Sequence, residues 1–259
     1  MLPERCDVVV VGAGNAAMCA AFAAREAGVD VIVLERAPRD EEGGNTRFTA
    51  GAIRFAYDGV DDLRALMPDL TDEEVARTDF GQYTEENFFD DMARVTENRT
   101  DPDLAELLVR RSRATLMWLR DKGVRFVPIY GRQAFKVDGR FRFWGGLTVE
   151  AWGGGPGLVE AQRAIATKQG IPVFHEARAL SLVHDDDGVR GVVVRHMGTT
   201  RTVHCRAVVL AAGGFESNPE WRTRYLGPGW DLAKVRGTRF NTGDGIRMAL
   251  DAGAAPCGN

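Results

Sequence analysis

A glycine turn between a run of valines and a helical segment constrains the fold of this 259-residue chain more than any other feature. The valines at 8–11 form a continuous apolar run, which is typical of a strand buried on both faces of a parallel sheet. The motif Gly12-x-Gly14-x-x-Ala17 follows at once, and residues 16–27 favour a helix. A strand, a glycine turn and a helix in this order predict a site for the pyrophosphate of a dinucleotide.

The small residues of the turn and the carboxylate after the next strand have separate physical roles. Gly12 permits the tight turn, Gly14 allows the backbone to approach the phosphates, and Ala17 keeps helix and strand close. The phosphates would lie at the positive amino end of the helix. A strand expected at 29–34 ends at Glu35, which suits a ribose 2′-hydroxyl and repels a 2′-phosphate, so NADP is disfavoured. The alternative is a glycine turn in an α/β protein without a cofactor.

Composition and charge exclude several classes of protein. With 44% hydrophobic and 27% charged residues the chain is typical of a soluble globular protein, and its net charge of −4 argues against a general nucleic-acid binder. No apolar run approaches the roughly 20 residues that span a bilayer, and the valine run does not fit a signal peptide. The cysteines at 6, 19, 205 and 257 are far apart, so reduced thiols and a cytoplasmic location are expected.

From Thr71 to about Lys122 the pattern is helical. Thr71-x-x-Glu74 is a capping box, and a helix is expected to begin at Asp101-Pro102 and to end at Gly123. One stripe follows helical spacing on this helix and is expected to pack in the core rather than to bind substrate: Leu104, Leu107, Leu108, Arg111, Thr115, Trp118 and Leu119. Asp138-Gly139, between two alternating runs, predicts a β-hairpin.

The rest of the chain returns mainly to strands. Runs at 172–175, 179–184, 191–196 and 200–205 predict a small meander, with a turn at 185–188. That acidic turn and the four histidines lack metal-ligand spacing, so no metal site is expected. A glycine-rich stretch at 153–157 opens a helix over 158–168 and either holds an anion or lets the chain pass beneath a ligand. A further helix is expected at 246–252, with Thr242 or Asp244 as its cap.

With these blocks in order, the chain resembles the flavoprotein family of fumarate reductases and succinate dehydrogenases, and within it the soluble tricarballylate dehydrogenases. Five stretches carry the resemblance: Gly12–Ala17 with Glu35; Gly43-Gly44-Asn45-Thr46 with Ala50-Gly51; Gly153–Gly157; Ala211-Ala212-Gly213-Gly214-Phe215; and Asn241-Thr242-Gly243-Asp244-Gly245.

The resemblance implies an α/β fold: a Rossmann-like FAD-binding domain of the glutathione-reductase type, with a parallel sheet, a β-meander and a helical insertion. Residues 1–259 would be a single, incomplete FAD-binding domain with core segments 1–58 and 150–259. The helical and hairpin insertion would occupy 59–149. The capping domain and the closing segment of the family are expected to be absent, which predicts exposed apolar surface on the sheet.

The resemblance also implies FAD as the dinucleotide. Glu35 would hold the adenosine ribose, Ala179 the adenine, the stretch 43–51 the flavin, and Asp244 the ribityl chain. Since no histidine occurs between Glu35 and Gly51, the flavin is expected to be noncovalent. The residues assigned to the cofactor are Gly12, Gly14, Asn15, Ala16, Ala17, Glu35, Arg36, Gly43, Gly44, Asn45, Thr46, Thr49, Ala50, Gly51, Ala179, Ala211, Gly213, Asn241, Thr242, Gly243 and Asp244.

The activity that the resemblance implies is dehydrogenation of a di- or tricarboxylate such as tricarballylate, or the reverse reduction, by hydride transfer at flavin N5. The partners would be a small carboxylic acid and an unidentified electron acceptor. The catalytic arginine of the family belongs to the capping domain, so no catalytic residue is assigned, although Arg47, Arg54, Arg236 and Arg239 could reach the flavin pocket. The alternatives are a non-catalytic FAD-binding fragment and a flavoenzyme similar to ketosteroid dehydrogenases.

Overall fold

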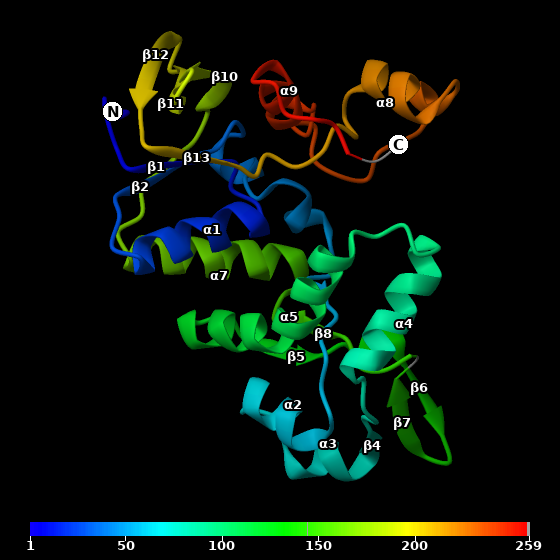
Figure 1. Cartoon of the computed structure of the whole chain (residues 1–259). Coiled ribbons are helices and arrows are strands. Elements are labelled where there is room, and N and C mark those ends of the chain that lie inside the picture. The colour runs from blue at the N-terminus through cyan, green and yellow to red at the C-terminus, as the bar shows by residue number, and fades with distance from the viewer. Residues whose placement is uncertain (144, 258–259) are drawn as a thin grey trace. The chain divides into compact units, whose positions relative to one another are not determined.

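The computed structural model describes residues 1–143 and 145–257. The chain forms two compact units, one made of Met1–Thr49 and Leu158–Asn259 and the other of Ala50–Gly157. Each unit has its own sheets and helices (Figure 1).

The first unit is organised around a parallel sheet in the order β13-β1-β2-β9. Its strands are β1 (Val8–Val11), β2 (Val31–Leu34), β9 (Val173–Phe174) and β13 (Ala207–Leu210). Every neighbouring pair is parallel, with Val8 opposite both Val31 and Ala207. The predicted parallel sheet and its buried valine strand are confirmed, and the carboxyl ends of the three longer strands lie at one edge.

The central strands are buried on both faces, which explains their unbroken apolar runs. Residues 9, 11, 32 and 34 belong to one cluster with a β-meander, which consists of β10 (Arg178–Asp185), β11 (Gly188–His196) and β12 (Thr199–His204). Alternation directs the intervening valines to the opposite face. There α1 (Asn15–Glu26) and α7 (Gly154–Lys168, in this unit from Leu158) lie side by side (Figure 1).

Short elements complete the first unit. They are η1 (Arg39–Glu41), η2 (Gly44–Phe48), α8 (Pro219–Leu226), η3 (Trp230–Leu232) and α9 (Asp244–Asp251). The meander turns where predicted, with Asp185 opposite Gly188. The prediction that the run at 172–175 belongs to the meander is wrong, because Val173 and Phe174 pair with β2 in the parallel sheet. At the sheet edge, Val209 of β13 is 36% exposed.

The expected side-chain cap of α9 is wrong. Gly243 occupies the N-cap position and supplies no side chain. The hydroxyl of Thr242 instead accepts a hydrogen bond from Arg36, and the carboxylate of Asp244 is paired with Arg36 and Arg178. These distant ionic partners take the two side chains that local sequence assigned to the cap.

The second unit contains helices and two small sheets. The helices are α2 (Val60–Leu66), α3 (Asp72–Arg77), α4 (Glu85–Thr96), α5 (Pro102–Lys122) and α6 (Tyr130–Gln133). One sheet orders β3 (Ala52–Ile53), β8 (Val149–Ala151) and β5 (Phe126–Pro128); the other orders β4 (Thr78–Asp79), β7 (Arg140–Phe143) and β6 (Ala134–Val137). The capping box of α3, the end of α5 at Gly123 and the hairpin between β6 and β7 are confirmed.

The predicted stripe of α5 is mostly exposed, so the prediction that it packs in the core is wrong for most of its residues. Leu104, Leu107 and Leu108 are 64%, 57% and 53% exposed. The residues that α5 buries are Val109, Leu116 and Leu119. The helix forms where predicted, but the leucines near its start do not mark the face that packs.

In the described part of the chain, no helix combines the length and the apolar character that crossing a bilayer requires.

We expect Tyr57→Phe to lower the free energy of unfolding by about 1–3 kcal/mol, because it leaves buried polar groups without a partner. The Tyr57 hydroxyl donates to the Phe80 carbonyl at 2.7 Å and accepts from the Leu147 N–H at 2.9 Å. Urea unfolding of the two proteins measures the difference. Tyr225→Phe, at a side chain 45% exposed, is the control and should change stability by less than about 0.5 kcal/mol. Equal effects of the two substitutions would contradict the prediction.

A candidate dinucleotide-binding site

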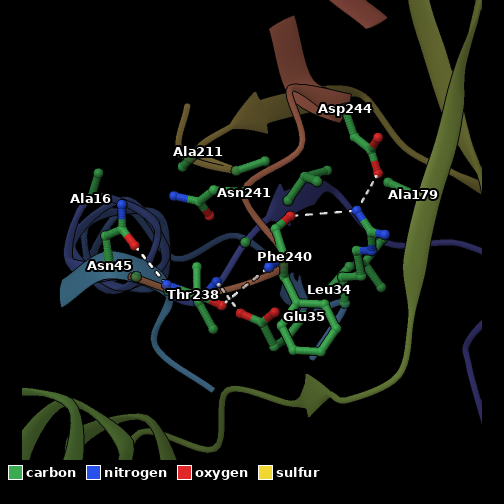
Figure 2. A pocket seen from close by; sticks show the side chains of 18 of the residues that line it. Ala16, Leu34, Glu35, Asn45, Ala179, Ala211, Thr238, Phe240, Asn241 and Asp244 are labelled. Carbon is green, nitrogen blue, oxygen red and sulfur yellow. Dashed lines mark hydrogen bonds and ion pairs between the residues drawn. The ribbon is translucent and has the colours of Figure 1, made fainter. Parts of the chain in front are cut away.

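A cavity opens at the carboxyl edge of the parallel sheet (Figure 2). This is where open α/β sheets bind their ligands, because the loops after the strands diverge there. Its lining comes from segments far apart in the sequence: 11–16, 34–36, 44–46, 177–179, 211–213, and four residues of 238–244. All of these segments belong to the first unit.

The glycine turn is held against the end of β13. Gly12 has a φ of +110°, and a Cβ at this position would lie 2.4 Å from the Ala211 carbonyl oxygen. Its N–H donates to the Leu34 carbonyl at 2.8 Å. The glycine is therefore required by the protein's own backbone, in addition to any ligand.

The amino end of α1 faces the cavity and supplies a positive dipole to it. Gly14 is the N-cap, makes no side-chain cap, and is followed by a first turn without acidic residues. The Asn15 N–H donates to the Thr46 hydroxyl at 2.9 Å, which ties η2 to the turn. This arrangement suits an anionic phosphate, since a helix amino terminus combines free N–H groups with positive potential.

Glu35 follows β2 directly and is only 6% exposed. Its carboxylate accepts hydrogen bonds from the Ala13 N–H at 3.0 Å and from the Ala37 N–H at 2.8 Å. Burial raises the pKa of Glu35, and the two backbone hydrogen bonds oppose that rise. Each carboxylate oxygen has a further lone pair, so the group can still accept a ribose hydroxyl.

Asp244 joins two arginines at the side of the cavity where Ala179 lies (Figure 2). The Arg178 guanidinium binds it at both oxygens, with distances of 2.9 and 3.1 Å, and Arg36 approaches one oxygen at 3.1 Å. Burial alone would raise the pKa of Asp244, but the hydrogen bond and charge of Arg178 and the charge of Arg36 lower it. Two guanidinium groups sharing one carboxylate leave a positive charge, which favours phosphate binding.

Asn45 and Asn241 lie on the opposite side of the cavity (Figure 2). Asn45 belongs to η2, whose N-cap Gly43 has a φ of +97°. The Asn45 side-chain oxygen accepts from the Thr238 N–H at 2.9 Å. Asn241 is only 6% exposed, so its amide has a fixed environment.

The cavity brings together most of the residues predicted from sequence. Those that line it are Gly12, Gly14, Asn15, Ala16, Glu35, Arg36, Gly44, Asn45, Thr46, Ala179, Ala211, Gly213, Asn241 and Asp244. Ala17, Gly43, Thr49, Thr242 and Gly243 belong to the same unit but are not part of the lining. Ala50 and Gly51 belong to the other unit, where a Cβ on Gly51 would lie 2.7 Å from the backbone of Gly154.

Several residues around the cavity were missed by sequence reasoning. Arg178, Thr238 and Phe240 line it, and Glu216 binds two of its amides. Two of them could have been found as neighbours of residues already assigned to the cofactor, since Arg178 precedes Ala179 and Phe240 precedes Asn241. Of the arginines considered from sequence, Arg239 is paired with Glu41 at 2.6 Å.

Buried Glu42 also escaped prediction. It is 4% exposed and pairs with Arg163 and with His175, the latter at 2.5 Å. Burial acts to raise the pKa of Glu42, but the His175 hydrogen bond and the Arg163 charge lower it. Among the described residues, no group of histidine, cysteine and acidic side chains is arranged to hold a metal ion.

The parallel sheet, the glycine turn and the cavity at the strand ends define a dinucleotide-binding domain. The family described as "FAD binding domain" matches residues 7–259. The chain therefore belongs to this family, and FAD is its cofactor.

Relatives and solved structures agree with this family. The chain is 30% identical to "Fumarate reductase (cytochrome)" of Shewanella frigidimarina over 253 residues, 96% of this chain and 40% of that protein. The structure of the open conformation of a flavocytochrome c3 fumarate reductase superposes with a TM-score of 0.76 at 28% identity, covering 97% of this chain and 41% of that one. The chain thus spans about two fifths of these proteins.

A 3-ketosteroid-Δ4-(5α)-dehydrogenase from Rhodococcus jostii RHA1 is similar in fold, with a TM-score of 0.76 at 24% identity. The match covers 98% of this chain and 55% of that one.

The residues present fit FAD. The close approach of Gly12 to Ala211 makes the narrow turn that a pyrophosphate needs. The amino end of α1 supplies positive potential, and Glu35 supplies an acceptor at the end of β2. The pair of arginines on Asp244 adds positive charge.

We expect Gly12→Ala to weaken FAD binding at least about tenfold, since the added methyl group collides with the Ala211 carbonyl and moves the turn. Quenching of flavin fluorescence measures the affinity. Gly28→Ala is a matched control, because Gly28 has a φ of +78° but nothing within 4 Å of the added group. It should cost about 1–2 kcal/mol of stability from backbone strain alone and leave FAD binding unchanged. Wild-type affinity in Gly12→Ala would contradict the prediction.

Asp244 should contribute a pH-dependent part of the stability. Its pKa is lower in the folded chain than the ordinary value of 3.8, so its stabilisation is present above about pH 4 and is lost as the pH falls through the folded pKa. Asp244→Asn should therefore flatten the fall in unfolding free energy below about pH 4. Urea unfolding across pH tests this. Asp251→Asn, at an exposed ion pair with Arg247, should keep the wild-type slope, and an equal flattening there would contradict the assignment.

Proposed function

We propose that this chain is the FAD-binding part of an oxidoreductase that dehydrogenates a di- or tricarboxylate such as tricarballylate, or reduces a fumarate-like acid. The observation that carries the proposal is the cavity at the sheet edge, which is lined by the glycine turn, Glu35 and Asp244. The chain that forms it is 30% identical to a fumarate reductase over 96% of its length. When bound, FAD supplies a hydride acceptor or donor at flavin N5.

The chain's own residues bind and orient this cofactor. The amino end of α1, from Gly14 to Ala16, receives the phosphates, and Arg36 and Arg178 add positive charge beside them. Glu35, held by two backbone N–H groups, accepts from a ribose hydroxyl. We propose noncovalent attachment, since no histidine occurs between Glu35 and Gly51.

The substrate class follows from the fumarate reductase relatives. A carboxylate in a water-excluding site requires cationic partners, because an uncompensated buried charge is costly. Among the described residues, the arginines that line the cavity, Arg36 and Arg178, are already paired with Asp244. We therefore assign them to the cofactor, and we place the substrate clamps and the catalytic acid or base outside the cavity described here.

The cofactor part of the proposal is tested by reconstitution. The purified chain is mixed with FAD or with NAD, freed of excess ligand, and its visible spectrum recorded. We expect flavin absorption bands to stay with the protein and NAD not to be retained. Retention of NAD without FAD would identify a nicotinamide enzyme and overturn the proposal.

The substrate part is tested with a natural protein that contains this chain, loaded with FAD. Tricarballylate and succinate should bleach the flavin bands, and fumarate should reoxidise the reduced flavin. Bleaching by a 3-ketosteroid alone would overturn the carboxylate assignment in favour of a steroid dehydrogenase. Bound flavin that no acid or steroid reduces would indicate a non-catalytic FAD-binding protein.

A further inference from the structure

Glu216 is a carboxylate that binds two residues of the cavity lining. It follows β13 by six residues and does not line the cavity itself. One carboxylate oxygen, Oε1, accepts hydrogen bonds from two cavity residues: the Asn45 amide nitrogen, and the Asn241 amide nitrogen at 3.1 Å. A single oxygen thus joins two amides from segments almost 200 residues apart.

Three glycines make room for these three side chains. A Cβ on Gly213 would lie 2.5 Å from the Asn241 amide nitrogen, and one on Gly214 would lie 2.5 Å from Glu216 Oε2. A Cβ on Gly237 would lie 2.4 Å from the Asn45 side-chain oxygen. Every one of these distances is shorter than real Cβ contacts, so a side chain at any of the three glycines would displace the end of the Asn241, Glu216 or Asn45 side chain.

The hydrogen bonds fix the orientation of the amides. An amide nitrogen only donates and an amide oxygen only accepts. Because the Asn45 nitrogen is bound to Glu216, its oxygen is free to accept from the Thr238 N–H at 2.9 Å. The same bond from Asn241 determines which end of that amide faces Glu216. Without the carboxylate, both amide nitrogens lose this shared acceptor, and the Asn45 side chain keeps the hydrogen bond that its oxygen accepts from the Thr238 N–H.

The backbone of Glu216 is bound by a buried arginine. Arg222 is 8% exposed and donates to the backbone carbonyl of Glu216. The same guanidinium donates to the carbonyls of Trp230 and Asp231, both at 2.9 Å. The 3-10 helix η3 and the backbone of Glu216 are therefore connected through the side chain of Arg222.

We propose that Glu216 is a positioning residue for FAD: by binding Asn45 and Asn241 with one oxygen, it sets the amide surface that this side of the cavity presents to the cofactor. The inference rests on the assignment of the cavity to FAD. Glu216 acts through the two asparagines and does not touch the cofactor itself.

The test compares two substitutions that differ in one acceptor. Glu216→Gln keeps an oxygen that can accept from both amides, so FAD affinity should stay within about threefold of wild type. Glu216→Ala removes the acceptor and should weaken FAD binding about tenfold or more. Affinity is measured by quenching of flavin fluorescence. The control is Glu220→Ala, an exposed glutamate in the first turn of α8, which should leave FAD binding unchanged.

A double-substitution cycle separates positioning from a general loss of structure. If Glu216 acts through Asn45 and Asn241, its removal should cost much less in a background that already carries Asn45→Ala and Asn241→Ala. An equal cost in both backgrounds would overturn the inference. So would wild-type affinity in Glu216→Ala. A Glu216→Gln variant as weak as Glu216→Ala would assign the effect to charge and would also overturn it.

Circular dichroism and thermal unfolding of each variant without FAD show whether it folds. If Glu216→Ala does not fold, Gly237→Ala displaces the same amide with Glu216 intact, because its methyl group meets the Asn45 oxygen. It should weaken FAD binding about tenfold, and wild-type affinity would overturn the inference. Gly131→Ala, with nothing within 4 Å of the added group, is its control. Failure of the wild-type chain to bind FAD would instead refute the cofactor assignment.

Discussion

The structure of the site depends on the close approach of two strand ends. The turn after β1 passes so near the end of β13 that only a glycine fits at position 12. The N–H of Gly12 also donates to the carbonyl of Leu34, at the end of β2. This contact brings the carboxyl ends of three parallel strands to one edge, where α1 begins. The cavity follows from that geometry, because each strand is continued by a segment that lines it.

Much of the fold could be predicted because its signals are local. The valine run, the glycine turn, the capping box at Thr71 and the Asp138-Gly139 hairpin each lie within a few residues. The errors came where tertiary contacts decide. Distant arginines engage the side chains expected to cap α9, and α5 buries Val109 and Leu116 instead of the three leucines near its start. Helical periodicity states which residues share a face and does not state what covers it.

The site was predictable in its backbone and not in its side-chain network. Small residues at Gly12, Gly44 and Gly213 are recognisable because a ligand or a neighbouring backbone excludes larger ones. The polar partners have no such local signature. Arg178 meets Asp244 across 66 residues, and Glu216 meets Asn45 across 171. Of the two glycines that precede Phe215 and Glu216, Gly213 was assigned from sequence to the cofactor, yet both provide space for protein side chains.

The two sides of the cavity differ in their electrostatics: one carries charged groups and the other neutral amides. Near Ala179, two guanidinium groups share one carboxylate, and the amino end of α1 adds further positive potential. On the other side the carboxylate of Glu216 is met by neutral amides, so the surface facing the cavity there consists of dipoles. FAD needs both, since its phosphates are anionic and its oxidised ring system is neutral. A carboxylate that lined the cavity in place of these amides would repel the phosphates. Glu216 lies behind the amides of Asn45 and Asn241, so it orients the two amides without lining the cavity.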